Sequence, residues 1–332
     1  MSSTQNHKII VYISVLNWNK ADDTLVCIEH LLKSNLPKTT SMQIYVVDNG
    51  SSDADYQKLS TGLLELPIHL IRLENNLGFS GGHNKIMQLA IDDNVDYVWL
   101  VNNDGLSLPD TLSNLILAAE QDPKIGAVSP KIISRGDNGT VDFCGAYHDW
   151  NNFLGVRLTV DQKESDFAEQ DLWLVGAACL FRVNALKDVG LLEDRYFAYF
   201  EDNEISTKLA FSGWKNKVAL DAIFLHDIPT QRQPYFYYLM ARNELFFWPK
   251  YTPNSNKLFV TLKILERSIY LANKLLLDGE QEKSKACLLG CWDGLFNNYG
   301  KPNVDSQRKV PYILEILRRI LFNRHMKYIK TS

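Results

Sequence analysis

Asp96-Tyr97-Val98-Trp99-Leu100-Val101-Asn102-Asn103-Asp104-Gly105 is the stretch that decides the fold of this chain. A short apolar run ends abruptly in two amides, a carboxylate and a glycine, which is typical of a buried strand that stops at a sheet edge. In open α/β sheets, ligands bind at the carboxyl ends of the strands. Asp104 is therefore well placed to hold a divalent cation against phosphate, although Asn-Asp-Gly is also ordinary chemistry for a turn.

The residues before this stretch alternate between strand and helix patterns. Apolar, β-branched runs predict strands at residues 9–16, 42–47, 68–73 and 97–101. Helical spacing predicts helices at residues 22–33 and 56–64, and a third that ends near residue 92. We therefore predict an α/β fold with a mostly parallel sheet and flanking helices.

Each predicted strand ends in a turn rich in amides, acids or glycines. The turns are Asn17-Trp18-Asn19, Asp48-Asn49-Gly50, residues 78–84 and residues 102–105. Carboxyl ends of parallel strands share one edge, so these turns predict a nucleotide cleft in which backbone N–H groups bind phosphate and Asp48 accepts hydrogen bonds from a base or ribose. Any one turn taken alone is equally well explained as chain reversal.

Composition and missing motifs argue against several classes of protein. The 332 residues carry a formal charge of −4, which gives no general attraction to nucleic acid. No apolar run reaches the roughly 20 residues that span a bilayer, and the N-terminus lacks the apolar segment of a signal peptide, so we expect a cytoplasmic protein. The first strand is not followed by Gly-x-Gly-x-x-Gly, and the chain has no Gly-x-x-x-x-Gly-Lys-Ser/Thr loop, which disfavours an oxidoreductase and an ATPase. The five cysteines show no Cys-x-x-Cys spacing and are expected to be single buried thiols.

The motifs together resemble the family-2 glycosyltransferases of the GT-A fold, and within them the rhamnosyltransferase-like branch of bacterial surface-polysaccharide synthesis. The resemblance runs over about residues 9–247. It rests on the order and spacing of Asn17-Trp18-Asn19, Val47-Asp48-Asn49-Gly50-Ser51-Ser52-Asp53, residues 76–84, Asn102-Asn103-Asp104, Gly176-Ala177 and Phe197-Ala198-Tyr199-Phe200-Glu201-Asp202.

The resemblance implies a donor site. Asp48 would recognise the nucleobase, and residues 78–84, as a loop, would approach the ribose or the donor sugar. The residues implied to bind the nucleotide sugar are Asn17, Asn19, Asp48, Gly81, Asn84, Asn102, Asn103 and Gly176.

It also implies a metal site for Mg²⁺ or Mn²⁺. Asp104 matches the last acid of the family's Asp-x-Asp motif, but Asn102 stands where the family has the first acid. A site with one carboxylate should depend on the donor phosphates for much of its coordination. His226 matches a position that adds a metal ligand in parts of the family, although a lone histidine is equally well explained as a structural residue.

For catalysis, the resemblance selects Asp202 as the general base and leaves Glu201 as a neighbour that orients the acceptor or the base. Aromatic residues precede these acids, and burial beside such rings raises a carboxylate's proton affinity. Acids at the start of a helix are also favoured by electrostatics alone. Arg242 and Asn243, in an expected helix at residues 235–247, are candidates for acceptor or phosphate contacts.

After Pro249 the pattern becomes helical, so we divide the chain into a catalytic domain at residues 1–250 and a helical region at 251–332. The last part, from Lys309 to Lys330, is basic and amphipathic. It is expected to contact the inner face of the cell membrane, to pack on the catalytic domain or to form a homodimer.

The predicted function is therefore inverting transfer of a sugar from a nucleoside-diphosphate donor to a hydroxyl group of a glycan, which would be lipid-linked. Rhamnose carried by dTDP is the first choice, and galactofuranose or another hexose carried by UDP is the alternative. From a different class, a sugar-nucleotide pyrophosphorylase lacks its Gly-rich basic loop here. A non-catalytic sugar-nucleotide-binding protein would not need the acids Asp104 and Asp202.

Overall fold

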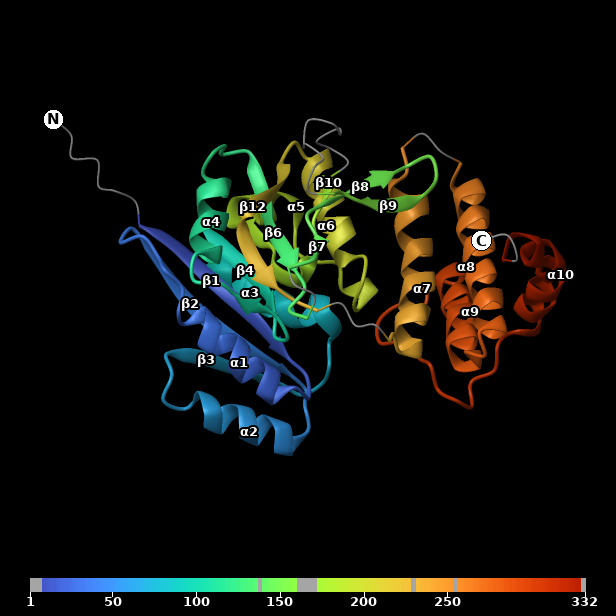
Figure 1. Cartoon of the computed structure of the whole chain (residues 1–332), viewed down its shortest axis with the longest axis horizontal. Helices are drawn as coiled ribbons and strands as arrows, with labels where there is room; N and C mark the ends of the chain where they lie inside the picture. The colour runs from blue at the N-terminus through green and yellow to red at the C-terminus, as the bar shows by residue number, and fades with distance from the viewer. Residues whose placement is uncertain (1–7, 137–138, 160–171, 228–230, 254–255, 330–332) are drawn as a thin grey trace. The chain divides into compact units, whose positions relative to one another are not determined.

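The computed structural model describes residues 8–136, 139–159, 172–227, 231–253 and 256–329 (Figure 1). Lys330 and the N-terminal residues 1–7, which lack a signal-peptide pattern, lie outside the described residues. By their internal contacts, the residues form two compact units. Unit 1 comprises Met1–Asp149, Gly155–Glu193 and Glu201–Ile228, and unit 2 comprises Trp150–Leu154, Asp194–Phe200 and Pro229–Ser332.

Unit 1 is built on one large sheet, in which β1 to β4 alternate with helices as predicted (Figure 1). Its strand order is β3-β2-β1-β4-β11-β6-β12-β5, and β7 pairs with β6. The pairs β1–β2, β2–β3, β1–β4 and β6–β12 are parallel, whereas β11 runs antiparallel between β4 and β6. The strands are β1 (Ile9–Asn17), β2 (Thr40–Asn49), β3 (Ile68–Leu73), β4 (Tyr97–Asn102), β5 (Leu106–Ser107), β6 (Ile125–Ile133), β7 (Val141–Phe143), β11 (Leu180–Arg182) and β12 (Lys215–Leu225). A smaller sheet has the order β10-β8-β9, formed by β8 (Ala146–Asp149), β9 (Leu154–Arg157) and β10 (Leu172–Trp173).

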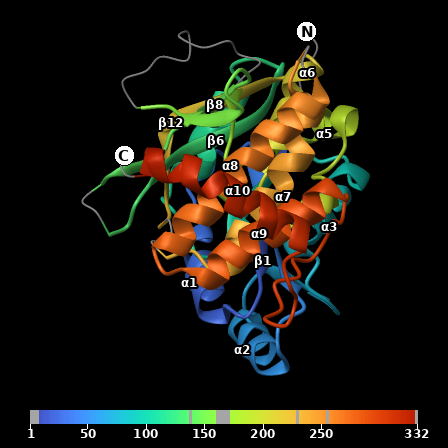
Figure 2. The same cartoon turned by 90° about the vertical axis from the view of Figure 1, so that its right-hand side faces the viewer.

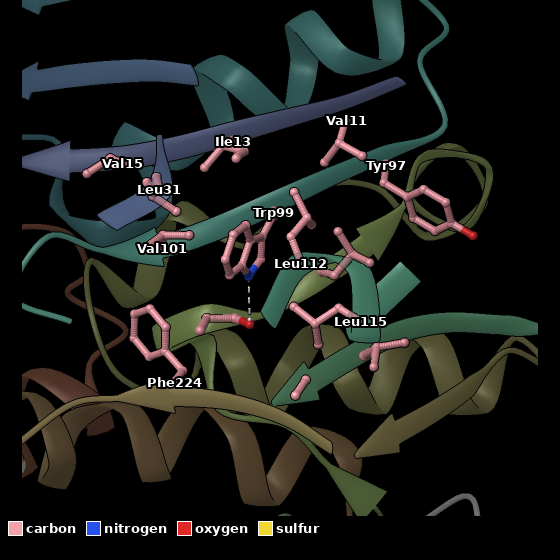
Figure 3. Packing of buried hydrophobic residues seen from close by; sticks show 14 of the residues in the cluster. Val11, Ile13, Val15, Leu31, Tyr97, Trp99, Val101, Leu112, Leu115 and Phe224 are labelled. Atoms are coloured by element: carbon pink, nitrogen blue, oxygen red, sulfur yellow. Dashed lines mark hydrogen bonds between the residues drawn. The ribbon is translucent and has the colours of Figure 1, made fainter. Parts of the chain in front are cut away.

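Helices cover both faces of the large sheet, because alternate residues of its central strands are apolar on each side. Ile13 of β1 and Trp99 of β4 belong to one buried cluster with residues of α1 (Ala21–Leu31), α2 (Asp53–Leu63) and α4 (Thr111–Ala119). Figure 3 shows this cluster, in which Trp99 donates its indole N–H to the carbonyl of Ala178 at 3.0 Å. The opposite face packs against α3 (Gly78–Asp92), α5 (Val183–Val189) and α6 (Glu201–Phe211).

The strand ends gather at one edge of the sheet, as the parallel pairing requires. Asn17 pairs with Asp48 in the β1–β2 register, and Leu16 pairs with Asn102 in the β1–β4 register. Gly50 closes the turn after β2 with a φ of +72°. A Cβ atom at this position would lie 2.6 Å from the backbone of Asn75, so only glycine permits the close approach of these two turns.

Unit 2 is helical, as the pattern after Pro249 predicts. It contains α7 (Pro234–Tyr251), α8 (Lys257–Leu277), α9 (Gln281–Leu295), α10 (Tyr312–Ile329) and the short η4 turn (Asp194–Tyr196). Helix α9 packs against α7 and α8, and α10 packs against α8 (Figure 2). No helix of the described residues combines the length and apolar character needed to cross a membrane.

One local expectation is wrong. Residues 78–84 are not a loop but the first turns of α3, because the glycines Gly81 and Gly82 are buried against the sheet, where a Cβ atom at Gly82 would collide with Leu16. The η3 turn (Gly176–Ala178) precedes β11. All five cysteines are buried and free, as expected.

Candidate active site

Asp48 ends β2 with its side chain fully buried. Its Oδ1 atom accepts a hydrogen bond from Asn17 Nδ2 at 3.0 Å. Among the residues that the structure describes, its Oδ2 atom has no hydrogen-bond donor, and Arg72 Nε lies 3.7 Å away. A buried carboxylate oxygen without a donor is costly, so it indicates a partner that binds there.

Asn17 holds this carboxylate in place. Its Nδ2 group also lies 3.1 Å from Ser51 Oγ and 3.0 Å from Asp55 Oδ2, and its Oδ1 atom accepts from Thr24. Because Asn17 is fully buried and its amide is already bonded, its role is to orient Asp48. The predicted direct contact of Asn17 with the nucleotide stays a prediction.

Asn19 lies in the exposed turn after β1, with a φ of +53°. Its backbone N–H donates to Ser51 Oγ at 2.9 Å, and its side-chain oxygen accepts from the N–H of Ser52. These bonds join the ends of β1 and β2. Trp18, beside it, leaves 51% of its surface exposed, which is unusual for a tryptophan.

Gly81 and Asn84 belong to α3, and the structure gives both of them packing roles. Gly81 is buried, and Asn84 exchanges two hydrogen bonds with the backbone of Leu192, Nδ2 to O at 2.8 Å and N to Oδ1 at 3.1 Å. Asn49 fixes the start of the same helix through the N–H of Leu77 and the carbonyl of Gly78. Donor contacts of Gly81 and Asn84 therefore stay predictions.

Asp104 lies just beyond β4, and the structure brings it together with His226, 122 positions later. His226 Nε2 is 3.1 Å from Asp104 Oδ1 and 3.4 Å from Asn102 Nδ2. Pairing of β12 with β6 and β5 places His226 at this edge. Asn103 points elsewhere and donates to Thr24 Oγ1 at 2.9 Å.

The environment of Asp104 keeps its carboxylate ionised. Partial burial raises its pKa, but the hydrogen bond and charge of His226, a backbone hydrogen bond and the charge of Arg135 together outweigh that effect, so the net pKa lies below the usual value. The Asp104 side chain is 48% exposed. The sheet edge therefore presents an accessible negative charge.

The side chains around Asp104 fit a divalent cation whose remaining ligands are phosphate oxygens and water. One carboxylate, one imidazole nitrogen and the amide of Asn102 converge. The described residues contain no group of three or more His, Cys, Asp or Glu side chains that could hold a metal ion by themselves. Two protein ligands leave most of the coordination sphere to phosphate oxygens and water, as Mg²⁺ prefers.

Asp202, in the first turn of α6, is held by two neighbours. Its Oδ1 atom accepts from the backbone N–H of Asn203 at 2.8 Å and from Asn203 Nδ2 at 2.9 Å. Its Oδ2 atom accepts from the N–H of Gly176 at 3.2 Å. A Cβ atom at Gly176 would press on the ring of Phe79 at 3.2 Å, so the absence of a side chain lets the Gly176 amide come this close.

The pKa of Asp202 is raised, unlike that of Asp104. Burial raises it, and the bonds from Asn203 and Gly176 lower it by less. Burial raises the pKa of Glu201 much further, and the charge of Asp202 adds to this effect. Glu201 Oε2 is buried and has no hydrogen-bond partner in the described part of the chain. Of the two acids, burial therefore favours the neutral form more strongly in Glu201 than in Asp202.

His148 orients the Asp202 carboxylate indirectly, through Asn203. His148 Nε2 lies 3.0 Å from Asn203 Oδ1, while Asn203 Nδ2 donates to Asp202. Burial lowers the pKa of His148 to about 4, so its ring is neutral near pH 7. Because the Asn203 oxygen faces it, His148 must carry its proton on Nε2. Sequence reasoning missed this relay, since His148 and Asn203 meet only through the fold.

Arg242 and Asn243 do not offer donors to a ligand. Both are fully buried in α7. Arg242 donates to the carbonyls of Gly300 and Tyr196, and Asn243 donates to those of Tyr196, Ala198 and Tyr199. The last carbonyls belong to a segment in which Phe197, Tyr199 and Phe200 all have positive φ angles. The two side chains stabilise this strained turn, and the idea that they contact acceptor or phosphate is not supported.

The carboxyl edge thus collects both predicted acids. Asp104 follows β4, and Asp202 is bonded to Gly176, whose η3 turn packs on β4 where Leu100 donates to the carbonyl of Cys179. Asp48 ends β2, two strands away on the other side of β4. One side of the sheet thus presents three groups. They are the buried Asp48 oxygen, which can accept a hydrogen bond, the ionised Asp104 carboxylate, and the Asp202 carboxylate, which can bind a proton.

Comparison with known proteins identifies the family of this chain. Residues 12–189 match the model of glycosyl transferase family 2. The galactofuranosyltransferase GlfT1 of Mycolicibacterium smegmatis is 26% identical over 192 residues, which cover 56% of this chain and 62% of that protein. The N-acetylglucosaminyl-diphospho-decaprenol L-rhamnosyltransferase of Mycobacterium tuberculosis is 26% identical over 223 residues, which cover 60% of this chain and 71% of that protein. The matched region thus spans about three fifths of the length of the first relative.

Solved structures agree on the fold. The crystal structure of S. aureus TarS 1-349 superposes with a TM-score of 0.56 at 15% identity, over 98% of this chain and 92% of that one. The mannosyltransferase PcManGT of Pyrobaculum calidifontis, solved with GDP-Man and Mn²⁺, gives a TM-score of 0.54 at 16% identity, over 86% and 87%. These neighbours confirm the predicted GT-A-type architecture. With the family model covering more than half of the sequence, the chain belongs to glycosyl transferase family 2.

Proposed function

We propose that this chain is an inverting, metal-dependent glycosyltransferase that moves a sugar from a nucleoside-diphosphate donor to a hydroxyl group of a glycan, in cell-surface polysaccharide synthesis. The observation that carries the proposal is the pair Asp104 and Asp202, which share one sheet edge but have pKa values shifted in opposite directions. An ionised, accessible carboxylate suits a charged ligand, whereas a buried one with a raised pKa suits proton transfer. Single displacement at a sugar carbon needs both.

The donor's nucleoside would bind against Asp48. Its Oδ2 atom can accept a hydrogen bond from an N–H group of a pyrimidine base, which would satisfy the buried oxygen. The exposed ring of Trp18 offers an apolar face beside the turn of Asn19. The further residues proposed to line the nucleotide-sugar site are Asn17, Gly81, Asn84, Asn102, Asn103 and Gly176.

The diphosphate would lie at Asp104. Asp104 and His226 would hold Mg²⁺ or Mn²⁺, and the ion would supply positive charge to the departing diphosphate. Asn102 Nδ2 lies 3.4 Å from the same His226 Nε2 atom, so Asn102 borders the proposed metal site. Because Asp104 is the site's single carboxylate, donor and metal should bind cooperatively.

Asp202 would act as the general base. Its Oδ2 atom, which accepts one long bond from Gly176, would take the proton of the acceptor hydroxyl. The acceptor oxygen then attacks the anomeric carbon from the face opposite the diphosphate, so one C–O bond forms as the other breaks and the configuration inverts. The raised pKa of Glu201 favours its neutral form, which would keep a second negative charge away from the attacking oxygen.

The donor sugar is proposed from the relatives. Rhamnose carried by dTDP is the first choice, because one relative is named a rhamnosyltransferase. Galactofuranose carried by UDP is the alternative, because another is named a galactofuranosyltransferase. That rhamnosyltransferase's name includes a decaprenol-linked substrate, which supports a lipid-linked glycan as acceptor here.

Helix α10 would bring the enzyme to the cytoplasmic face of the cell membrane. Its exposed side carries Ile313, Ile316 and Ile320 together with Arg319 and Arg324. Apolar and basic side chains on one helix face favour an anionic lipid surface. We assign catalysis to residues 1–250 and this contact to residues 251–332, and a homodimer through the same face is the competing arrangement.

Titration calorimetry tests the donor. The protein is titrated with dTDP-rhamnose, UDP-galactofuranose and UDP-glucose in Mg²⁺, in Mn²⁺ and in EDTA. We expect binding of dTDP-rhamnose that requires a divalent ion. A protein that binds none of these donors contradicts the proposal. Binding without release of nucleoside diphosphate in the presence of a lipid-linked acceptor favours a non-catalytic binding protein.

A further inference from the structure

Unit 2 contains an open cavity that the proposed reaction does not use. Its volume is about 700 Å³, and it lies between α9, the segment that follows α9 and the start of α10. Its lining residues come only from unit 2. They include the apolar side chains of Leu276, Leu288 and Val310 and the polar side chains of Gln281, Ser306 and Gln307.

The cavity is strongly cationic, although the chain as a whole carries a charge of −4. Lys285, Arg308, Lys309 and Arg318 line it, and Glu315 is the one carboxylate among the lining residues. Like charges gathered around one space repel one another, so the arrangement costs stability unless an anion binds there.

Ion pairs within the protein compensate only the two arginines. Arg308 forms two bonds of 2.7 Å with the carboxylate of Asp293, and Arg318 lies 2.8 Å from Glu315. Lys285 Nζ donates to the carbonyl of Ser306 at 2.5 Å. Within the described part of the chain, neither Lys285 nor Lys309 has a carboxylate partner. Two positive charges at the cavity are therefore uncompensated.

The donors are also fixed before any ligand arrives. Asp293 is 3% exposed, and it accepts from Tyr238 and Asn298 while it holds Arg308. The bond to Ser306 positions the Lys285 ammonium group in the same way. Preorganised donors lose little conformational freedom on binding, which favours affinity.

We propose that this cavity binds the phosphate group of an anionic ligand. Two lysine ammonium groups and neutral donors such as Ser306 and Gln307 match the oxygens of phosphate, and the guanidinium groups held by Asp293 and Glu315 line the same cavity. The cavity is much larger than one phosphate, and its apolar residues suit the remainder of a phosphate-bearing molecule. Free phosphate compounds and phospholipid headgroups share this chemistry, and the two sources are separated by experiment.

The test compares Lys285→Gln/Lys309→Gln with Lys301→Gln, which removes a charge from an exposed lysine of unit 2 outside the cavity. Binding of inorganic phosphate and pyrophosphate is measured by calorimetry in EDTA, so that metal-dependent binding at the donor site does not contribute. Binding to vesicles of phosphatidylcholine, with or without phosphatidylglycerol, is measured by flotation. Thermal melts check that each variant is folded.

We expect the double variant to bind at least roughly tenfold more weakly in one arm, since each lost charge-assisted hydrogen bond is worth about one decade. Loss in the calorimetry arm identifies a free phosphate compound, and loss of the phosphatidylglycerol-dependent binding identifies a headgroup. Wild-type affinity of the double variant in both arms, or an equal loss in Lys301→Gln, overturns the proposal. Neither arm depends on sugar transfer, so failure here leaves the proposed glycosyltransferase activity untouched.

Discussion

Asp104 and Asp202 are the same kind of side chain at the same sheet edge, yet their surroundings shift their pKa values in opposite directions. Asp104 follows a strand, is half exposed and lies beside a histidine, so its pKa is lowered. Asp202 begins a helix, is largely buried and has only neutral hydrogen-bond donors, so its pKa is raised. Neighbouring charges and solvent exposure, rather than residue type, therefore distinguish an acid that holds a charged ligand from one that accepts a proton.

The largest predicted effect is the contrast between Asp202→Asn and Asp104→Asn. Asp202→Asn should reduce transfer by about 10²–10⁴-fold, because the general base is lost, and leave donor affinity nearly intact. Asp104→Asn should weaken metal-dependent donor binding. Initial rates and donor calorimetry on both variants check this. An equal loss of donor binding in the two variants would remove the distinction between the acids.

A smaller effect tests how the hydrogen bond from Asn203 changes the pKa of Asp202. Asn203→Ala removes a hydrogen bond that lowers the pKa of Asp202, so this pKa should rise further and the acid limb of the pH–rate profile should move to higher pH. We expect kcat to fall about tenfold at neutral pH, within the range for a general base that is poorly ionised or positioned. Donor KM should be unchanged.

Two substitutions of His148 test whether it acts on Asp202 through Asn203. His148→Gln keeps an N–H donor that can reach Asn203 and should stay close to wild type, whereas His148→Ala should shift the profile in the direction of Asn203→Ala. A profile that is identical in His148→Ala and wild type would show that the histidine only fills space.

The smallest effect concerns stability. Glu201 has a pKa raised well above 4.5, so the unfolded chain ionises first as pH rises and the native state is progressively penalised up to the native pKa. Glu201→Gln removes that penalty. Its melting temperature relative to wild type should therefore increase from pH 4.5 upward, and differential scanning calorimetry at several pH values measures this. A constant difference across pH would mean that Glu201 is not the titrating group.

Much of unit 1 could be predicted from local pattern. The four strands up to Asn102 were predicted from continuous apolar runs that end in polar turns, because a parallel strand buried on both faces leaves a strong hydrophobic signal. Residues 78–84 were mistaken for a loop, since glycines that allow close packing of a helix on a sheet resemble glycines in a turn. Arg242 and Asn243 resembled ligand contacts, although backbone carbonyls take most of their hydrogen bonds and Arg242 Nε donates to Asn243 itself.

The sequence by itself determined the order of the elements, the family and the acids that end at one edge, since these depend on residue type and spacing along the chain. Only the tertiary structure decided that His226 meets Asp104 across 122 positions, and that His148 supports Asp202 through Asn203. It also decided which acid is ionised. The physical reason is that burial and hydrogen-bond partners set a pKa, and both arise from strand pairing and packing between distant segments.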